Sequence, residues 1–174
     1  EEPRFTANLY LSKLEEAQKV IKDLLLVFRG LLVWFDGKLS PAVNAYKRPI
    51  YTFTKGNVVD GQFNYQSSST RFRSNQIRVT WNNPDDMFKQ EVEIVEDTQN
   101  ILETGKIISK DVSAIGSTSR GQAHRYGKWH ILTEKMEKEV VTFATGLNGS
   151  VLRPGDVIDI QDADLSSVEH SGRV

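Results

Sequence analysis

The decisive stretch of this sequence is Gly116-Ser117-Thr118-Ser119-Arg120-Gly121-Gln122-Ala123-His124-Arg125. Within it, Ser119 and Gln122 have the spacing of a capping box, in which each side chain can satisfy a free backbone amide at the start of a helix. We therefore predict that Ser119-Arg120-Gly121-Gln122 opens a long helix over residues 119–138.

This helix has one face of small residues. Ala123 and Gly127 lie four positions apart, with Ile131 one turn further on, and Tyr126 and Trp129 supply apolar bulk beside them. Glycine inside a helix is about 1 kcal/mol less favourable than alanine. That cost is tolerable if another backbone packs closely against Gly127, so we predict that the face belongs to the core.

Shorter helices and strands are predicted before and after the long helix in the sequence. Asp97 is predicted to cap a short helix that Gly105 ends. Ile77, Val79 and Trp81 alternate with polar residues, as in a half-buried strand. The other strand candidates, with a turn at Asn82-Asn83-Pro84-Asp85, are residues 58–67, 75–82, 87–95, 106–112, 139–145 and 157–161.

The beginning of the chain is predicted to form a strand and then a helix. Residues 4–11 alternate as a short strand does, and Ser12-Lys13-Leu14-Glu15 is a second capping box. Gly30 suits the left-handed position that ends a helix. The apolar stripe of this helix is Leu14, Ala17, Ile21, Leu24 or Leu25, and Phe28.

A hairpin follows this helix. Residues 31–35 are strand-like, and Asp36-Gly37 favours a two-residue turn because both positions need a positive φ. Lys38 and Leu39 begin the return strand. Residues 40–56 contain two prolines, and we expect this segment to connect two parts of the chain.

Together these elements predict an α+β fold in two parts. Residues 1–55 form a small helix-plus-hairpin subdomain. Residues 56–174 form a larger, mostly antiparallel β subdomain with one short helix and one long helix near 119–138.

Composition narrows the classes of function. The 174 residues carry a net charge of −1, which gives no electrostatic basis for general nucleic-acid or membrane binding. Cysteine is absent, which excludes a disulfide scaffold and a thiolate zinc site. No apolar run of about 18 residues occurs, so stable membrane insertion is not expected. The chain begins at Glu1 without a visible signal peptide, and we expect it to be a piece of a longer protein.

No catalytic constellation is visible in the sequence. Gly37-Lys38 lacks the rest of a phosphate-binding loop. His124 and His130 lie about 240° apart on a helix and cannot face one metal ion. No nucleophile, base and orienting partner come together. We predict a protein that is not an enzyme and holds no metal or cofactor.

Two clusters leave alternatives open. Paired carboxylates could act on a sugar, although a solvated strand end explains the acidic cluster more simply; its members are Asp156, Asp159, Asp162 and Asp164. A mixed basic and aromatic group could bind single-stranded nucleic acid, although an edge strand or a subunit interface explains it better; its members are Arg71, Phe72, Arg73, Arg78 and Trp81.

Five short segments occur in an order that resembles the tip attachment protein J family of lambda-like phage tails. The resemblance covers roughly residues 5–174. The segments are Val58-Val59-Asp60-Gly61, Glu96-Asp97-Thr98-Gln99, Thr118 to Arg125, Arg153-Pro154-Gly155-Asp156-Val157-Ile158 and Ser171-Gly172-Arg173-Val174.

The resemblance implies a structural protein of a phage or prophage tail tip. In that family a baseplate hub of three subunits closes the distal end of the tail tube and carries receptor-binding parts further along the polypeptide. The implied partners are other copies of the chain, the tail tube and other tail-tip proteins, with no specific nucleic acid. The implied location is the virion, after assembly in the bacterial cytoplasm.

The residues that carry the resemblance are expected to be structural, as caps, packing positions and polar contacts at interfaces. They are Asp97, Arg120, Gly121, Gln122 and His124, and we add Gly127 for its place in the small face. One alternative is a carbohydrate- or peptidoglycan-active tail-tip domain that uses the acidic cluster. The other is a nucleic-acid-binding module.

Overall fold

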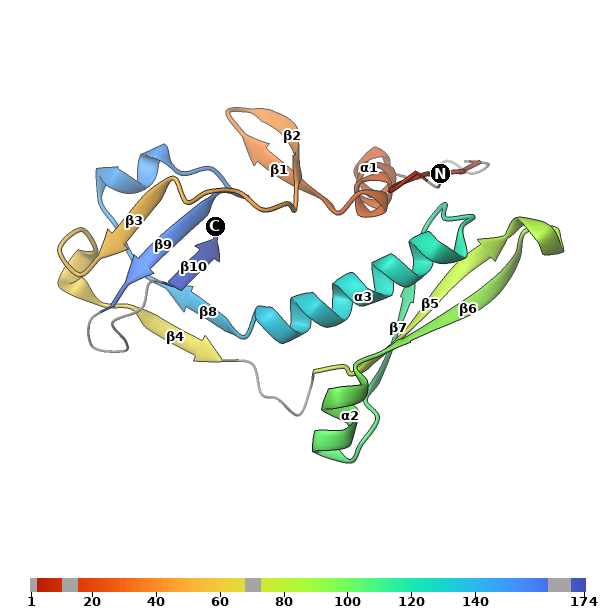
Figure 1. Cartoon of the computed structure of the whole chain (residues 1–174). Helices are drawn as coiled ribbons and strands as arrows, with labels where there is room; N and C mark the ends of the chain where they lie inside the picture. The colour runs from red at the N-terminus through yellow and green to blue at the C-terminus, as the bar shows by residue number, and fades with distance from the viewer. Residues whose placement is uncertain (1–2, 11–15, 68–72, 163–169) are drawn as a thin grey trace. The chain divides into compact units, whose positions relative to one another are not determined.

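The computed structural model describes residues 3–10, 16–67, 73–162 and 170–174. The chain divides into two compact units, which Figure 1 shows with their elements labelled. Unit 1 comprises Glu1–Phe28 and Ser67–Lys138, and unit 2 comprises Arg29–Gln66 and Glu139–Val174. The described residues therefore make an α+β protein, as the sequence predicts.

Each unit is built from two segments that are far apart in the sequence. In unit 2, β3 (Tyr51–Thr54) pairs in parallel with β9 (Val157–Gln161). This division differs from the single boundary after residue 55 that the sequence predicts. Local alternation identifies strands but does not report which distant strands pair.

Unit 1 contains a three-stranded sheet in the order β6-β5-β7. The central β5 (Gln76–Asn83) pairs antiparallel with β6 (Lys89–Glu96) and parallel with β7 (Ser109–Ser113). Ile77, Val79 and Trp81 of β5 are all buried. The alternation on this strand is therefore confirmed. The prediction of a mostly antiparallel sheet did not include the parallel pairing with β7.

Helix α3 (Arg120–Met136) packs on the face of this sheet that carries the buried β5 side chains. The Ser119 side chain accepts a hydrogen bond from the Gln122 amide, which confirms the predicted cap. Gly127 is buried, and a Cβ added there would lie 2.7 Å from Val95 Cγ2 and 2.8 Å from Val79 Cγ2. The predicted close packing of the small face is thus present.

The segment after β6 folds as its sequence predicts. Asp97 caps α2 (Thr98–Thr104), where its carboxylate accepts a hydrogen bond from the Asn100 amide. Gly105 ends this helix in the left-handed conformation, with φ 65°. Between β5 and β6, Asn83 caps the short helix η3 (Pro84–Asp86). One capping residue thus precedes β6 and another follows it: Asn83 caps η3, and Asp97 caps α2.

Two predictions for the beginning of the chain are wrong. Residues 4–10 are not in a strand, because their polar groups bond to the long-helix region instead of to a neighbouring strand. Helix α1 (Ala17–Val27) ends one residue earlier than expected, with Arg29 rather than Gly30 at positive φ. Gly30 is instead the first residue of β1 and lies opposite Val43.

The stripe on α1 is only partly buried. Leu25 is buried, whereas Ile21 and Leu24 are 38% and 40% exposed. The capping box at residues 12–15 lies outside the described residues. In the part of the chain that the structure describes, no helix is long and apolar enough to cross a membrane.

Unit 2 begins with the predicted hairpin. Strands β1 (Gly30–Phe35) and β2 (Lys38–Val43) are joined by Asp36 and Gly37, whose φ angles are 52° and 69°. The return strand continues through Pro41, in the segment predicted to be a connector. That prediction is wrong for residues 40–43, because proline is tolerated in a strand that has no second neighbour. It is also wrong for β3, which pairs with the distant β9.

The rest of unit 2 has two small sheets. β9 lies between β3 and β10 (His170–Arg173), and β4 (Asn64–Ser67) pairs with β8 (Glu139–Thr142). The predicted strand over 58–67 is confirmed only for β4, because residues Val59–Gly61 form the short helix η1, with Asp60 at φ 55°. A second short helix, η4, covers Leu147–Val151. The core of this unit is Phe53, Val58, Ile158 and Ile160.

We expect Gly127→Ala to destabilise the protein. The new methyl group would overlap Val79 and Val95, and overpacking typically costs about 1–3 kcal/mol, which exceeds the gain of about 1 kcal/mol in helix propensity. Chemical denaturation measures the difference. Gly172→Ala is the control, because a Cβ there meets nothing within 4 Å. Equal stability of the Gly127→Ala variant and the parent would contradict the close contact.

Candidate functional site

The buried side chain of Gln122 holds the first residues of the chain. Its Oε1 accepts hydrogen bonds from the amide and hydroxyl of Thr6, at 3.0 and 2.8 Å, and its Nε2 donates to the Thr6 carbonyl at 3.0 Å. Nearby, the Asn8 amide donates to the Gly116 carbonyl. Gln122 therefore has a second role beyond the predicted capping box: its amide binds a segment 116 positions earlier in the chain.

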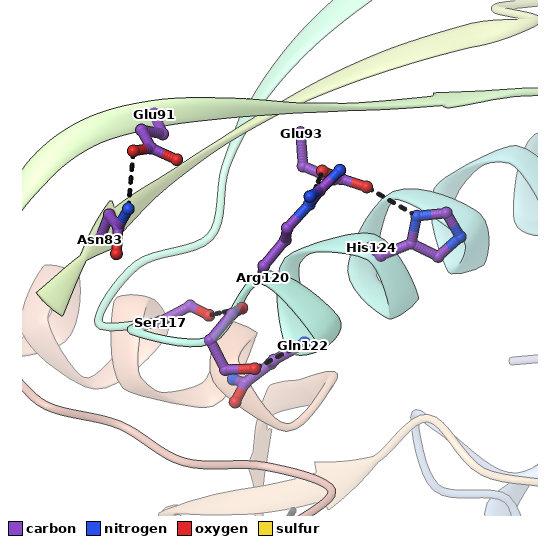
Figure 2. A network of polar contacts seen from close by, with 8 residues as sticks. Asn83, Glu91, Glu93, Ser117, Arg120, Gln122 and His124 are labelled. Atoms are coloured by element: carbon purple, nitrogen blue, oxygen red, sulfur yellow. Dashed lines mark hydrogen bonds and ion pairs between the residues drawn. The ribbon is translucent and has the colours of Figure 1, made fainter. Parts of the chain in front are cut away.

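Arg120 and His124 meet at a carboxylate of β6, which Figure 2 shows from close by. Arg120 Nε lies 2.7 Å from Glu93 Oε2, and His124 Nδ1 lies 3.0 Å from Glu93 Oε1. The Glu93 side chain is 12% exposed, while those of Arg120 and His124 are 74% and 51% exposed. Two solvent-exposed donors on the first turns of α3 thus cover one shielded acceptor on the sheet.

These donors determine the ionisation of Glu93. Burial by itself would raise the pKa of the carboxyl, but the hydrogen bonds from Arg120 and His124 outweigh burial and hold the pKa below its usual range. Glu93 is therefore ionised at neutral pH. A carboxylate held in this way accepts hydrogen bonds and does not act as a general acid.

Asp97 links α2 to the second half of α3. Lys135 Nζ lies 2.9 Å from Asp97 Oδ2, and the other oxygen accepts the capping bond from Asn100. The hydrogen bond from Lys135 and the capping amide lower the pKa of Asp97 against the effect of burial. The cap predicted from the sequence thus also anchors a distant helix.

Glu134 forms a third carboxylate contact in unit 1. It accepts hydrogen bonds from the amide and hydroxyl of Ser74, at 2.8 and 2.6 Å, and from Lys110 at 2.7 Å. Burial opposes ionisation, but these donors lower the pKa of Glu134. The contact ties the start of β5 and strand β7 to α3.

Several of these contact residues are missing from the sequence-based set. Glu93 and Glu134 are absent from it, as is Asn75, whose buried amide bonds to Asn100, Lys106 and Ile108. One signal was present: Glu93 occupies the same face of its strand as buried Val95, where a charge requires a partner. Of the predicted set, Gly121 is half-buried in the first turn of α3.

An open groove runs along β6 beside α3. It has a volume of about 630 Å³ and mixes apolar with charged side chains. Its lining residues are Ile94, Val95, Glu96, Asp97, Thr98, His124, Lys128, Ile131, Leu132 and Lys135. The groove therefore brings together two residues of the candidate set, Asp97 at the α2 cap and His124 on α3.

The acidic cluster does not form a pair of catalytic carboxylates among the described residues. Asp156 accepts from the Arg153 amide, and Asp159 accepts from the Ser171 hydroxyl. Asp162 is buried and accepts from the Tyr65 hydroxyl at 3.1 Å. Burial and this bond raise the pKa of Tyr65 to about 12. Asp164 lies outside the described residues.

The nucleic-acid alternative loses Trp81 as a stacking residue. Trp81 is 6% exposed in the core, and Arg78 is paired with Asp111 at 2.7 Å. Arg71 and Phe72 lie outside the described residues. A buried indole cannot stack on bases, so this part of the hypothesis is corrected.

The two histidines of α3 do not face one site. His124 contacts Glu93, whereas His130 packs edge-on against Tyr126, with ring centroids 4.7 Å apart. Within the described ranges, no group of three potential metal-ligating side chains occurs.

Comparison with known proteins identifies similar tail proteins. Residues 16–174 match the family model of a putative phage tail protein. A tip attachment protein J of Escherichia phage SECphi27 is 36% identical over 176 residues, covering 99% of this chain and 15% of that protein. The corresponding protein of Escherichia phage SECphi4 is 28% identical and is matched over 95% of this chain and 14% of its own length. The chain thus spans a small part of these relatives.

A solved structure shares the fold. A chain in the virion of a native gene transfer agent particle superposes with a TM-score of 0.68. The match covers 88% of this chain and 35% of the other, at 14% identity. At this identity the likeness is one of fold.

We expect Gln122→Ala to release the segment around Thr6. Loss of the three hydrogen bonds leaves the polar groups of half-buried Thr6 without these partners, which costs about 1 kcal/mol. Hydrogen exchange of the Asn8 amide should become faster, and the free energy of unfolding should fall. Gln99→Ala, at an exposed position of α2, is the control. Unchanged exchange at Asn8 would show that Gln122 does not hold this segment.

We expect Glu93→Gln to lower stability at neutral pH by about 1 kcal/mol, since its two partners are largely exposed. The lowered folded-state pKa means that the carboxylate stabilises above the unfolded value of about 4.3. This contribution is lost as pH falls through the folded pKa, so the variant and the parent should converge in acid. Denaturation at several pH values measures this, with exposed Glu91→Gln as the control. A difference independent of pH would contradict the charge-based role.

Proposed function

The chain belongs to the family of putative phage tail proteins, and from this membership we propose that it is a structural segment of a tail-tip protein. The observation that carries the proposal is 36% identity to a tip attachment protein J across 99% of the chain. The same membership supports a place in the virion tail, reached by assembly in the bacterial cytoplasm. No cofactor takes part in this role.

The segment would form part of a baseplate hub. In this proposal three copies surround the tail axis, close the distal end of the tube and connect it to receptor-binding parts of the same polypeptide. Exposed apolar residues support an assembly role, because such residues are enriched where proteins meet. At the β5–β6 turn, Met87 and Phe88 are 85% and 61% exposed.

The motif residues would give the segment the rigidity that a hub needs. Asp97, Arg120 and Gln122 each bind an element distant in sequence. His124 shares the acceptor of Arg120, and Gly127 allows α3 to approach the sheet. Gly121 lies half-buried in the first turn of α3, next to the cap of this helix. In this proposal they hold the subunit together, and exposed Arg120 and His124 also supply polar contacts to neighbours.

The experiment compares oligomeric states by light scattering. We expect this chain alone to be a monomer in dilute solution, because an interface below about 1,000 Å² is usually weak. The full-length parent protein should form trimers, and the isolated chain should do so only at high concentration. A monomeric parent, or rings of another order, would overturn the hub proposal.

A further inference from the structure

The first described residues of the chain occupy a site that a distant segment of unit 1 forms. Residues 3–10, here called the arm, are in no helix or strand. They contact the loop before α3 and the first turns of that helix, residues 116–125, here called the arm site. The central contact joins positions 116 residues apart in the sequence. The arm is therefore bound as a linear peptide ligand would be.

Two polar side chains of the arm are recognised by the site. Thr6 forms three hydrogen bonds with the side chain of Gln122, one of them from its hydroxyl. The Asn8 backbone amide donates to the Gly116 carbonyl at 2.9 Å, and its side-chain amide donates to the Thr118 hydroxyl at 2.7 Å. The contacts therefore favour a hydroxyl and a carboxamide two positions apart.

A glycine makes room for the next residue of the arm. Gly116 is buried and has φ 67°, and a Cβ built there would lie 2.7 Å from Leu9 Cγ. Glycine thus allows both the left-handed backbone and the close approach of the leucine. Arg125 adds two longer hydrogen bonds, at 3.4 Å, to the carbonyls of Pro3 and Arg4. The site therefore also accepts an apolar side chain directly after the asparagine.

The arm site is held in shape by hydrogen bonds that do not involve the arm. The Asn82 amide of β5 donates to the Ser117 carbonyl at 3.1 Å, and the Ser117 amide donates to the Ala114 carbonyl at 3.0 Å. The Ser119 hydroxyl accepts the capping bond from the Gln122 amide. A site built in this way is organised before its ligand binds, which lowers the cost of binding.

The arm itself is held at few points. All of its eight residues except half-buried Thr6 are exposed. In contrast, Gln122 is only 6% exposed, and its side-chain oxygen and nitrogen both bond to Thr6. If the arm leaves, these shielded polar atoms lose their partners, and the same peptide restores them whichever chain supplies it.

We propose that the arm site is a peptide-binding site for the segment Thr6-Ala7-Asn8-Leu9, and that in an assembly it takes this segment from a second copy of the chain. Exchange of an identical element between copies keeps the contacts of the closed chain and therefore costs little. A segment tethered within one chain has an effective concentration in the millimolar range. Neighbouring copies in a hub would supply their arms at a comparable concentration. The second copy rests on the proposed function, whereas the peptide site rests on the contacts alone.

Peptide binding tests the site. The whole chain carries Thr6→Ala and Asn8→Ala, which weaken its own arm, and the added peptide has the sequence of residues 3–10. We expect saturable binding in the millimolar range or tighter, measured by NMR as shifts of the Gly116 and Gln122 amides. Absence of saturable binding would overturn the proposal.

Two matched controls test the selectivity of this binding. A peptide that carries the same two alanines should bind roughly tenfold more weakly, and this comparison leaves the site unchanged. Adding Gln122→Ala to the protein should weaken binding of the unaltered peptide by a similar factor, with circular dichroism confirming the fold. Equal affinity of the two peptides would show that the site does not recognise these side chains.

Mixing two variants tests the second copy. One chain carries Gln122→Ala and keeps its arm, and the other carries Thr6→Ala and Asn8→Ala and keeps its site. We expect sedimentation at millimolar concentration to show a mixed dimer that neither chain forms alone, with slower hydrogen exchange of the Asn8 amide in the first chain. The control replaces the second chain with one that carries all three changes and should give no dimer.

The outcomes separate this proposal from the hub proposal. Peptide binding without a mixed dimer would show that the arm acts within its own chain, and exchange between copies would be wrong. That result would leave the trimer of the full-length protein untouched. Conversely, a monomeric full-length protein together with a mixed dimer of the variants would overturn the hub and retain the arm site.

Discussion

Unit 1 depends on the close approach of α3 to its sheet at Gly127. Val79 and Val95 occupy the space where a side chain at this position would lie. This contact sets the height of the helix above β5 and β6. At that height, donors on its first turns reach Glu93 and donors on its last turns reach Asp97. A larger residue at 127 would therefore alter polar contacts at both ends of the helix as well as the packing between them.

The carboxylates of unit 1 act as acceptors that join elements. Glu93, Asp97 and Glu134 each bind groups from a different part of the chain, and each has a lowered pKa. Their positive partners are mostly exposed, so each pair contributes modestly. Their main effect is to select which elements pack together, and their contribution to the free energy of unfolding is small. Each of these three acids is therefore held as a hydrogen-bond acceptor within the fold.

The sheet of unit 1 is covered on one face and open along one edge in the described residues. One face of β5 and β6 is covered by α3, and the outer edge of β6 keeps its backbone groups directed outward. The covered face joins the helix and the sheet into one packed unit.

Local signals in the sequence were enough to predict the caps at Asp97 and Ser119, the left-handed Gly105, the Asp36-Gly37 turn and the buried face of β5. Each depends on residues within a few positions of one another. The sequence did not predict the parallel pairings of β5 with β7 and of β3 with β9. It also did not predict the hydrogen bonds between Gln122 and Thr6 or the ion pair between Glu93 and Arg120. These depend on which distant segments meet, and only the packed chain decides that, because alternation and capping carry no information about partners far along the sequence.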